Sequence, residues 1–181
     1  MSNPPDILEL HLPIEEGGLN AVDLLAAESG LSKQRIKQAM QKGAVWVSRG
    51  KQTRHLRRAK KPLQAGETLH LYYNETVLAE EPPAPVLIAD EGSYSIWYKP
   101  YGLRSQGTKW TDHCTINRWL EQHLTPQRPS FIVHRLERAA TGLIIIAHSK
   151  AMAAAFSKLF RERAISKRYR VVVHGEFSAS E

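Results

Sequence analysis

The chain has 181 residues, of which 42% are hydrophobic, and a formal net charge of +7. This composition excludes wholesale disorder and allows one or two domains with real cores. No apolar run reaches the roughly 18 residues of a membrane span, and the N-terminal residues lack the pattern of a secretory signal. The single cysteine, Cys114, excludes an internal disulfide and, beside His113, makes no metal site. We therefore expect a cytoplasmic protein without a membrane partner.

The positive charge is gathered in one part of the chain. Residues 1–32 carry six acidic residues and no Lys or Arg, whereas residues 33–61 carry eleven basic residues and no acidic one. Such a run can be a solvated face, but its self-repulsion inside a folded segment needs a reason. Phosphate binding is the simplest one, so the run predicts a polyanionic partner.

The first part of the chain predicts a short extension and a small domain. Residues 1–17 form the extension, with an alternating strand that Pro13 ends. Residues 18–76 form the domain, where Asn20 and Ser32 each precede apolar residues at helical spacing and predict two short helices. A strand after Gly43 and an alternating strand from Thr68 to Tyr73 complete it.

Residues 77–86 are predicted to be a linker, because three of the residues from Pro82 to Pro85 are prolines. The remaining residues, 87–181, predict a second domain. Its expected strands cover residues 93–98, 143–147 and 167–175, and its expected helices begin at Thr115 and Ser149. We expect the apolar face of the last helix to be core; its residues are Met152, Phe156, Leu159 and Phe160.

Two resemblances follow from these patterns. The stretch from Leu31 to Val47, with Gly66-Glu67 before the last strand of the small domain, resembles an S4 RNA-binding domain. This resemblance implies that the basic second helix and the strand after it face RNA; the residues at those positions are Lys33, Arg35, Lys37, Lys42 and Arg49.

The second domain resembles the RluA-type family of RNA pseudouridine synthases. The resemblance is carried by three motifs, which are Lys99-Pro100 with Gly102, His134-Arg135-Leu136-Glu137-Arg138 with Thr141-Gly142-Leu143, and Lys167 and Tyr169 with Val173 and Gly175. It implies an α+β fold on a mostly antiparallel sheet. It also implies isomerisation of uridine to pseudouridine in structured RNA, ribosomal or transfer RNA, by a monomer without a cofactor.

The same resemblance implies the roles of single residues. Glu137 would be the catalytic carboxylate, Arg135 its partner and aid to base flipping, and Tyr169 the ring that stacks on uracil. Lys99 and Arg138 would contact RNA. A guanidinium beside a carboxylate keeps it ionised, as a nucleophile or base requires.

Two departures from the family pattern leave alternatives open. Glu137 stands where the family has Asp, so the carboxylate is one methylene further from the backbone. The chain also lacks the later part of the family's sheet, and we expect either a C-terminally truncated piece or a naturally short protein. The alternatives to the enzyme are a catalytically silent RNA-binding protein of the same fold and, less favoured, a DNA-binding protein.

Overall fold

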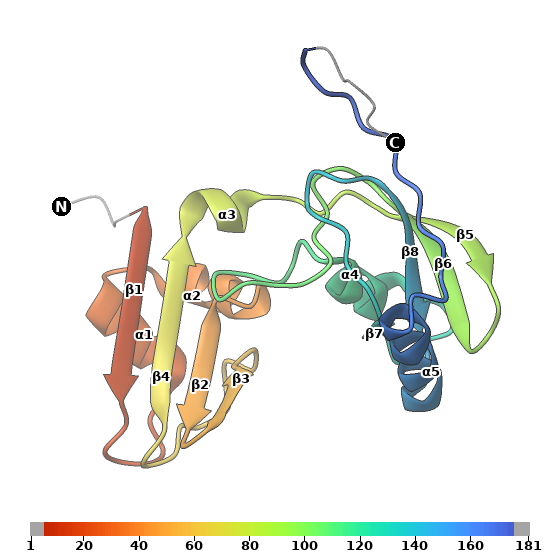
Figure 1. Ribbon diagram of the computed structural model, residues 1–181. Coiled ribbons are helices and arrows are strands. Elements are labelled where there is room, and N and C mark those ends of the chain that lie inside the picture. Colours follow the sequence, from red (N-terminus) through yellow and green to blue (C-terminus); the bar gives the residue numbers. More distant parts are fainter. Residues whose placement is uncertain (1–5, 176–181) are drawn as a thin grey trace.

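The structure is a computed structural model that describes residues 6–175. Eight strands form two four-stranded sheets; they are β1 (Ile7–Pro13), β2 (Val45–Arg49), β3 (Gln52–His55), β4 (Thr68–Asn74), β5 (Val86–Asp90), β6 (Tyr94–Lys99), β7 (Phe131–Ile132) and β8 (Gly142–Ala147). The helices are α1 (Ala21–Ser29), α2 (Lys33–Gln41), α3 (Glu75–Ala79), α4 (Ile116–His123) and α5 (Lys150–Arg161). The two sheets lie side by side, joined by α3 and the chain that follows it (Figure 1).

The first sheet has the order β1-β4-β2-β3, and all its neighbours are antiparallel. The predicted helices form where Asn20 and Ser32 cap them, and Gly30 ends α1 with φ +70°. Helices α1 and α2 lie behind the sheet in the view of Figure 1. The core between helices and sheet includes Leu25, Ile36 and Leu71, each 0% exposed.

The second sheet has the order β5-β6-β8-β7 and is also antiparallel. Strand β8 is central because its apolar run can be buried on one face; Ile144 and Ile146 are 0% exposed. They share a core with Trp97 and with Leu120 of α4. The α+β class and the antiparallel sheet predicted from the sequence are therefore confirmed.

The loop between β6 and α4 connects the two sheets. The Asp112 carboxylate pairs with Arg57 and lies 3.3 Å from His55 Nε2. The backbone N–H of Asp112 and the Thr111 hydroxyl both donate to the Lys42 carbonyl, at 3.2 and 2.8 Å. These bonds tie the loop to the C-terminal end of α2 and to β3.

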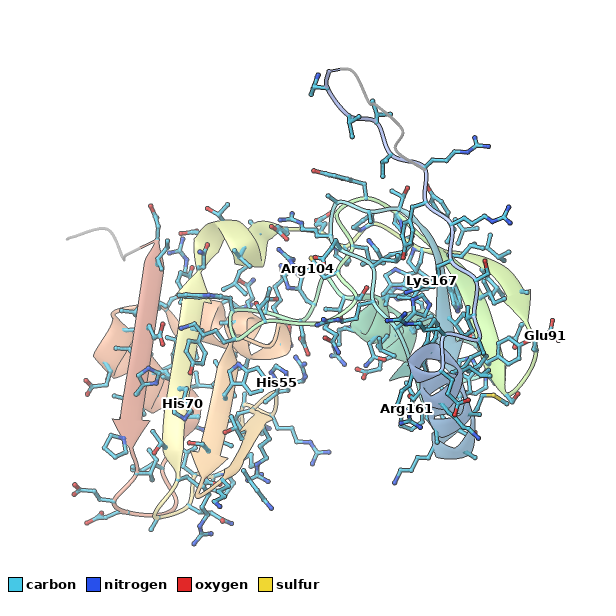
Figure 2. All side chains as sticks on the ribbon, in the orientation of Figure 1. His55, His70, Glu91, Arg104, Arg161 and Lys167 are labelled. Carbon is cyan, nitrogen blue, oxygen red and sulfur yellow. The ribbon has the colours of Figure 1, made fainter. Side chains whose placement is uncertain are left out.

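The chain before the second sheet does more than connect. Residues 77–79 of the predicted linker belong to α3, and β5 begins at Val86. Between them, Glu80 pairs with Arg104 at 2.8 Å and with Arg138 at 3.1 Å. Arg104 lies between the two sheets (Figure 2). The extended segment is thus anchored by ion pairs to the second sheet's loops.

The predicted strand from Lys167 to Gly175 is wrong. The segment has no helix or strand assignment, and Val172 is fully exposed. A strand needs a neighbour whose backbone groups complete its ladder, and none of the described strands pairs with this segment. In Figure 1 it leaves α5 as an extended trace that passes the second sheet.

The prediction that one face of α5 is core is also wrong. No residue of α5 is buried, and Leu159 is 40% exposed. Phe156 packs edge-on against Tyr94, and Phe160 against His134, with ring centroids 5.1 and 4.8 Å apart. These two contacts lie on one side of the helix, so they cover its apolar face only in part.

No helix in the part of the chain that the structure describes is long and apolar enough to cross a membrane.

Candidate active site

Glu137 and Tyr169 line the same cleft of the second unit, which is the part of the chain built on the sheet β5-β6-β8-β7; the first unit is built on the sheet β1-β4-β2-β3. The volume of this cleft is about 920 Å³. The loop before β8, the strand itself, the end of α5 and the extended segment after it form its walls. Lys167 lies beside the second sheet in Figure 2 and lines this cleft with Arg168 and Arg170. The cleft therefore combines one carboxylate, one exposed aromatic ring and three basic side chains.

The loop that carries Glu137 is held by its neighbour Leu136. The Ser105 hydroxyl donates to the Leu136 carbonyl at 2.8 Å and accepts from the Leu136 N–H at 3.0 Å. Gly102 N–H donates to the Arg138 carbonyl at 3.0 Å, on the other side of Glu137. Leu136 is buried and Glu137 exposed. A rigid backbone thus presents the carboxylate to the cleft.

Lys99 is a correction to the predicted RNA-contacting residues. It is 0% exposed, and its ammonium donates to the carbonyls of Leu103 at 2.7 Å and Pro100 at 3.2 Å. Burial lowers the pKa of Lys99, and the negative charge of Glu137 opposes that shift. The side chain therefore shapes the turn after β6 from inside, where phosphate cannot reach it.

The two arginines around Glu137 have other partners. Arg135 donates to Gln106 Oε1 at 3.3 Å, and Arg138 pairs with Glu80. Within residues 6–175 there is no ion pair between Arg135 and Glu137, so the predicted partnership is absent from this structure. Arg135 is bonded to Gln106 of the loop after β6, whereas Glu137 lines the cleft with Tyr169.

His134 begins the motif that carries Glu137, and the sequence predicted no role for it. Its Nε2 accepts the Ile145 N–H at 3.0 Å, next to the point where β7 ends, and so continues the bonding of β8. Burial lowers the pKa of His134, and the charge of Lys167 acts in the same direction. Ser105 was missed as well, since one serine in a loop carries no sequence signal.

The predicted RNA-facing residues of the first unit differ in their surroundings. Lys33 pairs with Asp23 at 2.6 Å, Arg35 pairs with Glu75 at 2.8 Å, and the Lys42 ammonium donates to the Leu78 carbonyl at 2.5 Å. Lys37 and Arg49 are exposed and pair with no carboxylate among the described residues. Arg49 donates to the neutral Gln64 Oε1 at 3.1 Å, so neither side chain is held by a negative charge.

An exposed carboxylate beside an aromatic ring and basic side chains suits a substrate with a flat ring and negative charge. The carboxylate can act as a nucleophile or a base, and the ring can stack. No group of three or more His, Cys, Asp or Glu side chains in the described part of the chain is arranged to hold a metal ion.

Comparison with known proteins places this cleft in a family context. Residues 93–181 match the family model described as RNA pseudouridylate synthase. An uncharacterized RNA pseudouridine synthase of Aquifex aeolicus is 28% identical over 94% of this chain and 55% of its own length. Another from Synechocystis is 34% identical over 62% and 38%. The mitochondrial pseudouridylate synthase RPUSD4 of Rattus norvegicus is 32% identical over 51% and 26%.

The chain thus spans about half, or less, of the length of these curated relatives. The part that matches the family model contains the whole loop from His134 to Arg138, and Tyr169.

Proposed function

We propose that this protein is an RNA pseudouridine synthase that uses Glu137 as its catalytic carboxylate. The observation that carries the proposal is that Glu137 and Tyr169, far apart in the sequence, line one cleft within the residues that match the family model. The relatives named as RNA pseudouridine synthases support the reaction class.

The proposed reaction needs no oxidant and no second substrate. The bond between N1 of uracil and C1′ of ribose breaks, the base turns, and a bond forms between C5 and C1′. The proton on C5 leaves and N1 gains one, so electrons and atoms balance. The target nucleotide must first leave the stack of bases, as enzymes that act on a base require.

The cleft offers a group for each requirement. The ionised Glu137 is the nucleophile or base, and its exposure leaves it open to the ribose or the base. Tyr169, 60% exposed, offers a face for stacking, worth about 1–3 kcal/mol per base. Lys167, Arg168 and Arg170 line the same cleft and can contact the phosphates beside the flipped nucleotide.

Glu137 in place of Asp bears directly on activity. The longer side chain moves the carboxylate by on the order of 1 Å, and a misplacement of that size can change a rate about a hundredfold. We propose that the cleft, whose volume is about 920 Å³, accommodates the longer side chain. Under this proposal Glu137→Asp lowers the reaction rate. A higher rate would mean that the longer side chain of Glu137 limits the rate of the wild type.

The first unit extends the proposal to a partner. Its resemblance to an S4 domain and its run of basic residues support a structured RNA, ribosomal or transfer RNA, as the substrate. Lys37 and Arg49 are the proposed phosphate contacts of this unit, since both are exposed and unpaired with carboxylates among the described residues.

A second candidate function is RNA binding without catalysis. It is favoured by one observation, which is that Arg135 contacts Gln106 instead of Glu137. In that case the protein would hold the same RNA through the same surfaces and leave its uridines unchanged.

The experiment incubates the purified protein with ribosomal RNA and transfer RNA that lack pseudouridine, made by transcription. Nucleosides are then separated and pseudouridine is quantified. We expect pseudouridine from one of the two RNA classes with the wild type and none with Glu137→Ala. RNA binding without pseudouridine from either class would replace the proposed function by the second candidate.

A further inference from the structure

A second cleft lies between the two units, and the site described above does not use it. Its volume is about 760 Å³. One wall is the outer face of the first sheet, and the other is the loop before α4 together with β7. Ile132 and Ser105 line it, and Ser105 holds Leu136, so this cleft adjoins the loop of Glu137.

The wall from the first sheet is aromatic. Trp46 faces both His55 and His70 in the ladders of β2, and Tyr72 lies on the same face of β4. These rings point away from the core, which holds Val45, Val47 and Leu71 on the opposite face. Figure 2 labels His55 and His70 on this sheet. Trp46, His55 and Tyr72 line the cleft itself.

The aromatic wall is held in place by the second unit. Trp46 Nε1 donates to the Lys109 carbonyl at 2.9 Å, and the Trp46 and His55 rings lie 3.6 Å apart between centroids. The Lys109 ammonium lies 4.9 Å from the Tyr72 centroid and pairs with Glu9. The rings therefore form a fixed surface at which a flat group can stack without first ordering loose side chains.

The opposite wall has polar groups with unused bonding capacity. Asn117 Oδ1 and Ser130 Oγ line the cleft, are buried, and bond to no other group in residues 6–175. Buried polar atoms of a native protein nearly always have a partner. Gln106, at the same wall, accepts from Arg135. A ligand with its own donors can thus be bonded at its edge while its ring stacks.

A basic and an acidic side chain, Lys109 and Asp112, line the cleft. The Lys109 ammonium is paired with Glu9 and lies over the Tyr72 ring. Asp112 also lines the cleft, but its carboxylate is paired with Arg57. Aromatic rings with basic neighbours are typical of sites for single-stranded nucleic acid.

We propose that the cleft between the units binds an unpaired nucleotide of the same RNA strand that presents the target uridine at Glu137. Its base stacks against the wall of Trp46, His55 and Tyr72, and Asn117 and Ser130 accept hydrogen bonds from its edge. This assignment rests on the proposed function for the identity of the strand. It makes the protein select uridines that have an unpaired neighbour.

The test measures binding of a short single-stranded oligoribonucleotide to the full chain by fluorescence anisotropy. Tyr72→Leu removes a ring from the wall and should weaken binding about tenfold, since stacking is worth about 1–3 kcal/mol per base. Tyr72→Phe keeps the ring and should bind like the wild type. Tyr98→Leu is the matched control, because Tyr98 is 40% exposed and lines neither cleft.

Three results would overturn the proposal. The first is wild-type affinity of Tyr72→Leu, and the second is an equal loss with Tyr98→Leu. A duplex of the same sequence that binds as tightly, and is weakened as much by Tyr72→Leu, would also refute an unpaired nucleotide. The measurement needs no turnover, so it separates this proposal from the proposed function: Tyr72→Leu should weaken binding of the oligoribonucleotide even if no pseudouridine is ever formed.

Discussion

Ser105 holds both backbone groups of Leu136, the residue before Glu137. Its hydroxyl donates to the carbonyl at 2.8 Å and accepts from the N–H at 3.0 Å. Ser105 is 4% exposed, so neither bond can be replaced from bulk water. The position of the Glu137 backbone thus depends on a side chain more than thirty residues earlier.

Ser105→Ala should lower both stability and rate. It leaves two buried backbone groups without partners, and each costs about 1–3 kcal/mol. A shift of about 1 Å at a reacting group can change a rate about a hundredfold. We therefore expect kcat of Ser105→Ala to fall by roughly tenfold or more. Urea unfolding and single-turnover rates measure the two effects.

The control for that variant is Ser95→Ala. Ser95 is 0% exposed and bonds to Trp97 at 2.7 Å and His148 at 2.8 Å, but lines neither cleft. It should lose comparable stability and keep its rate where it is folded. Equal rates of the two variants would show that Ser105 does not position Glu137.

Acid should destabilise the protein in part through His134. Burial lowers the pKa of His134 below its ordinary 6.5, and its Nε2 must stay unprotonated to accept the Ile145 N–H. The unfolded chain then binds more protons than the folded one, so stability is full above pH 6.5 and falls as the pH drops through the folded-state pKa.

His134→Gln tests this sign, because an amide oxygen can accept the same bond without titrating. The loss of unfolding free energy on acidification should be smaller in the variant than in the wild type. Part of the loss should remain, since burial also lowers the pKa values of His55, His70 and His113. Identical pH profiles would contradict the role given to His134.

Gly43→Ala should weaken the contact between the two units. Gly43 has φ +84°, and an added Cβ would collide with the Asp112 carboxylate. Gly50 has φ +57° but open space around it, so Gly50→Ala should lose only the cost of a left-handed residue, about 1–2 kcal/mol. Urea unfolding should show a clearly larger loss for Gly43→Ala. Equal losses would mean that Asp112 does not dock at Gly43.

The salt dependence of RNA binding should separate Lys37 from Lys33. Lys33 is paired with Asp23, whereas Lys37 has no carboxylate partner among the described residues. Lys37→Gln should therefore reduce the slope of log affinity against log salt by about 0.9 or less, as for one lost phosphate contact. Lys33→Gln should change it less. The reverse order would reject Lys37 as a contact of the first unit.

Local signals predicted much of the fold. The caps Asn20, Ser32, Thr115 and Ser149 each accept a hydrogen bond from the first turn of the helix that they were predicted to begin, because capping depends on neighbouring residues. Strand β8 was also predicted from a local signal, because its apolar residues follow one another in the sequence. Strand β3, Gln52–His55, was missed, since its four polar residues are held by pairing with β2 and not by burial.

Long-range contacts account for the failures. Lys99 looks like a surface residue in the sequence, but its ammonium replaces water with the carbonyls of Pro100 and Leu103. The alternation from Lys167 to Val173 favours a strand, yet a strand exists only where another strand pairs with it. The site motifs located the Glu137 loop, whereas the partners of Arg135 and Arg138 depend on Gln106 and Glu80, which no local pattern connects to them.

Release of tritium from RNA labelled at C5 of uridine tests the central claim most directly, because the proposed bond between C5 and C1′ displaces that atom. The wild type should release tritium in proportion to the pseudouridine formed. Glu137→Gln, which keeps the shape and removes the charge, should bind the same RNA and release none above background. Equal release by Glu137→Gln and the wild type would contradict Glu137 as the catalytic carboxylate.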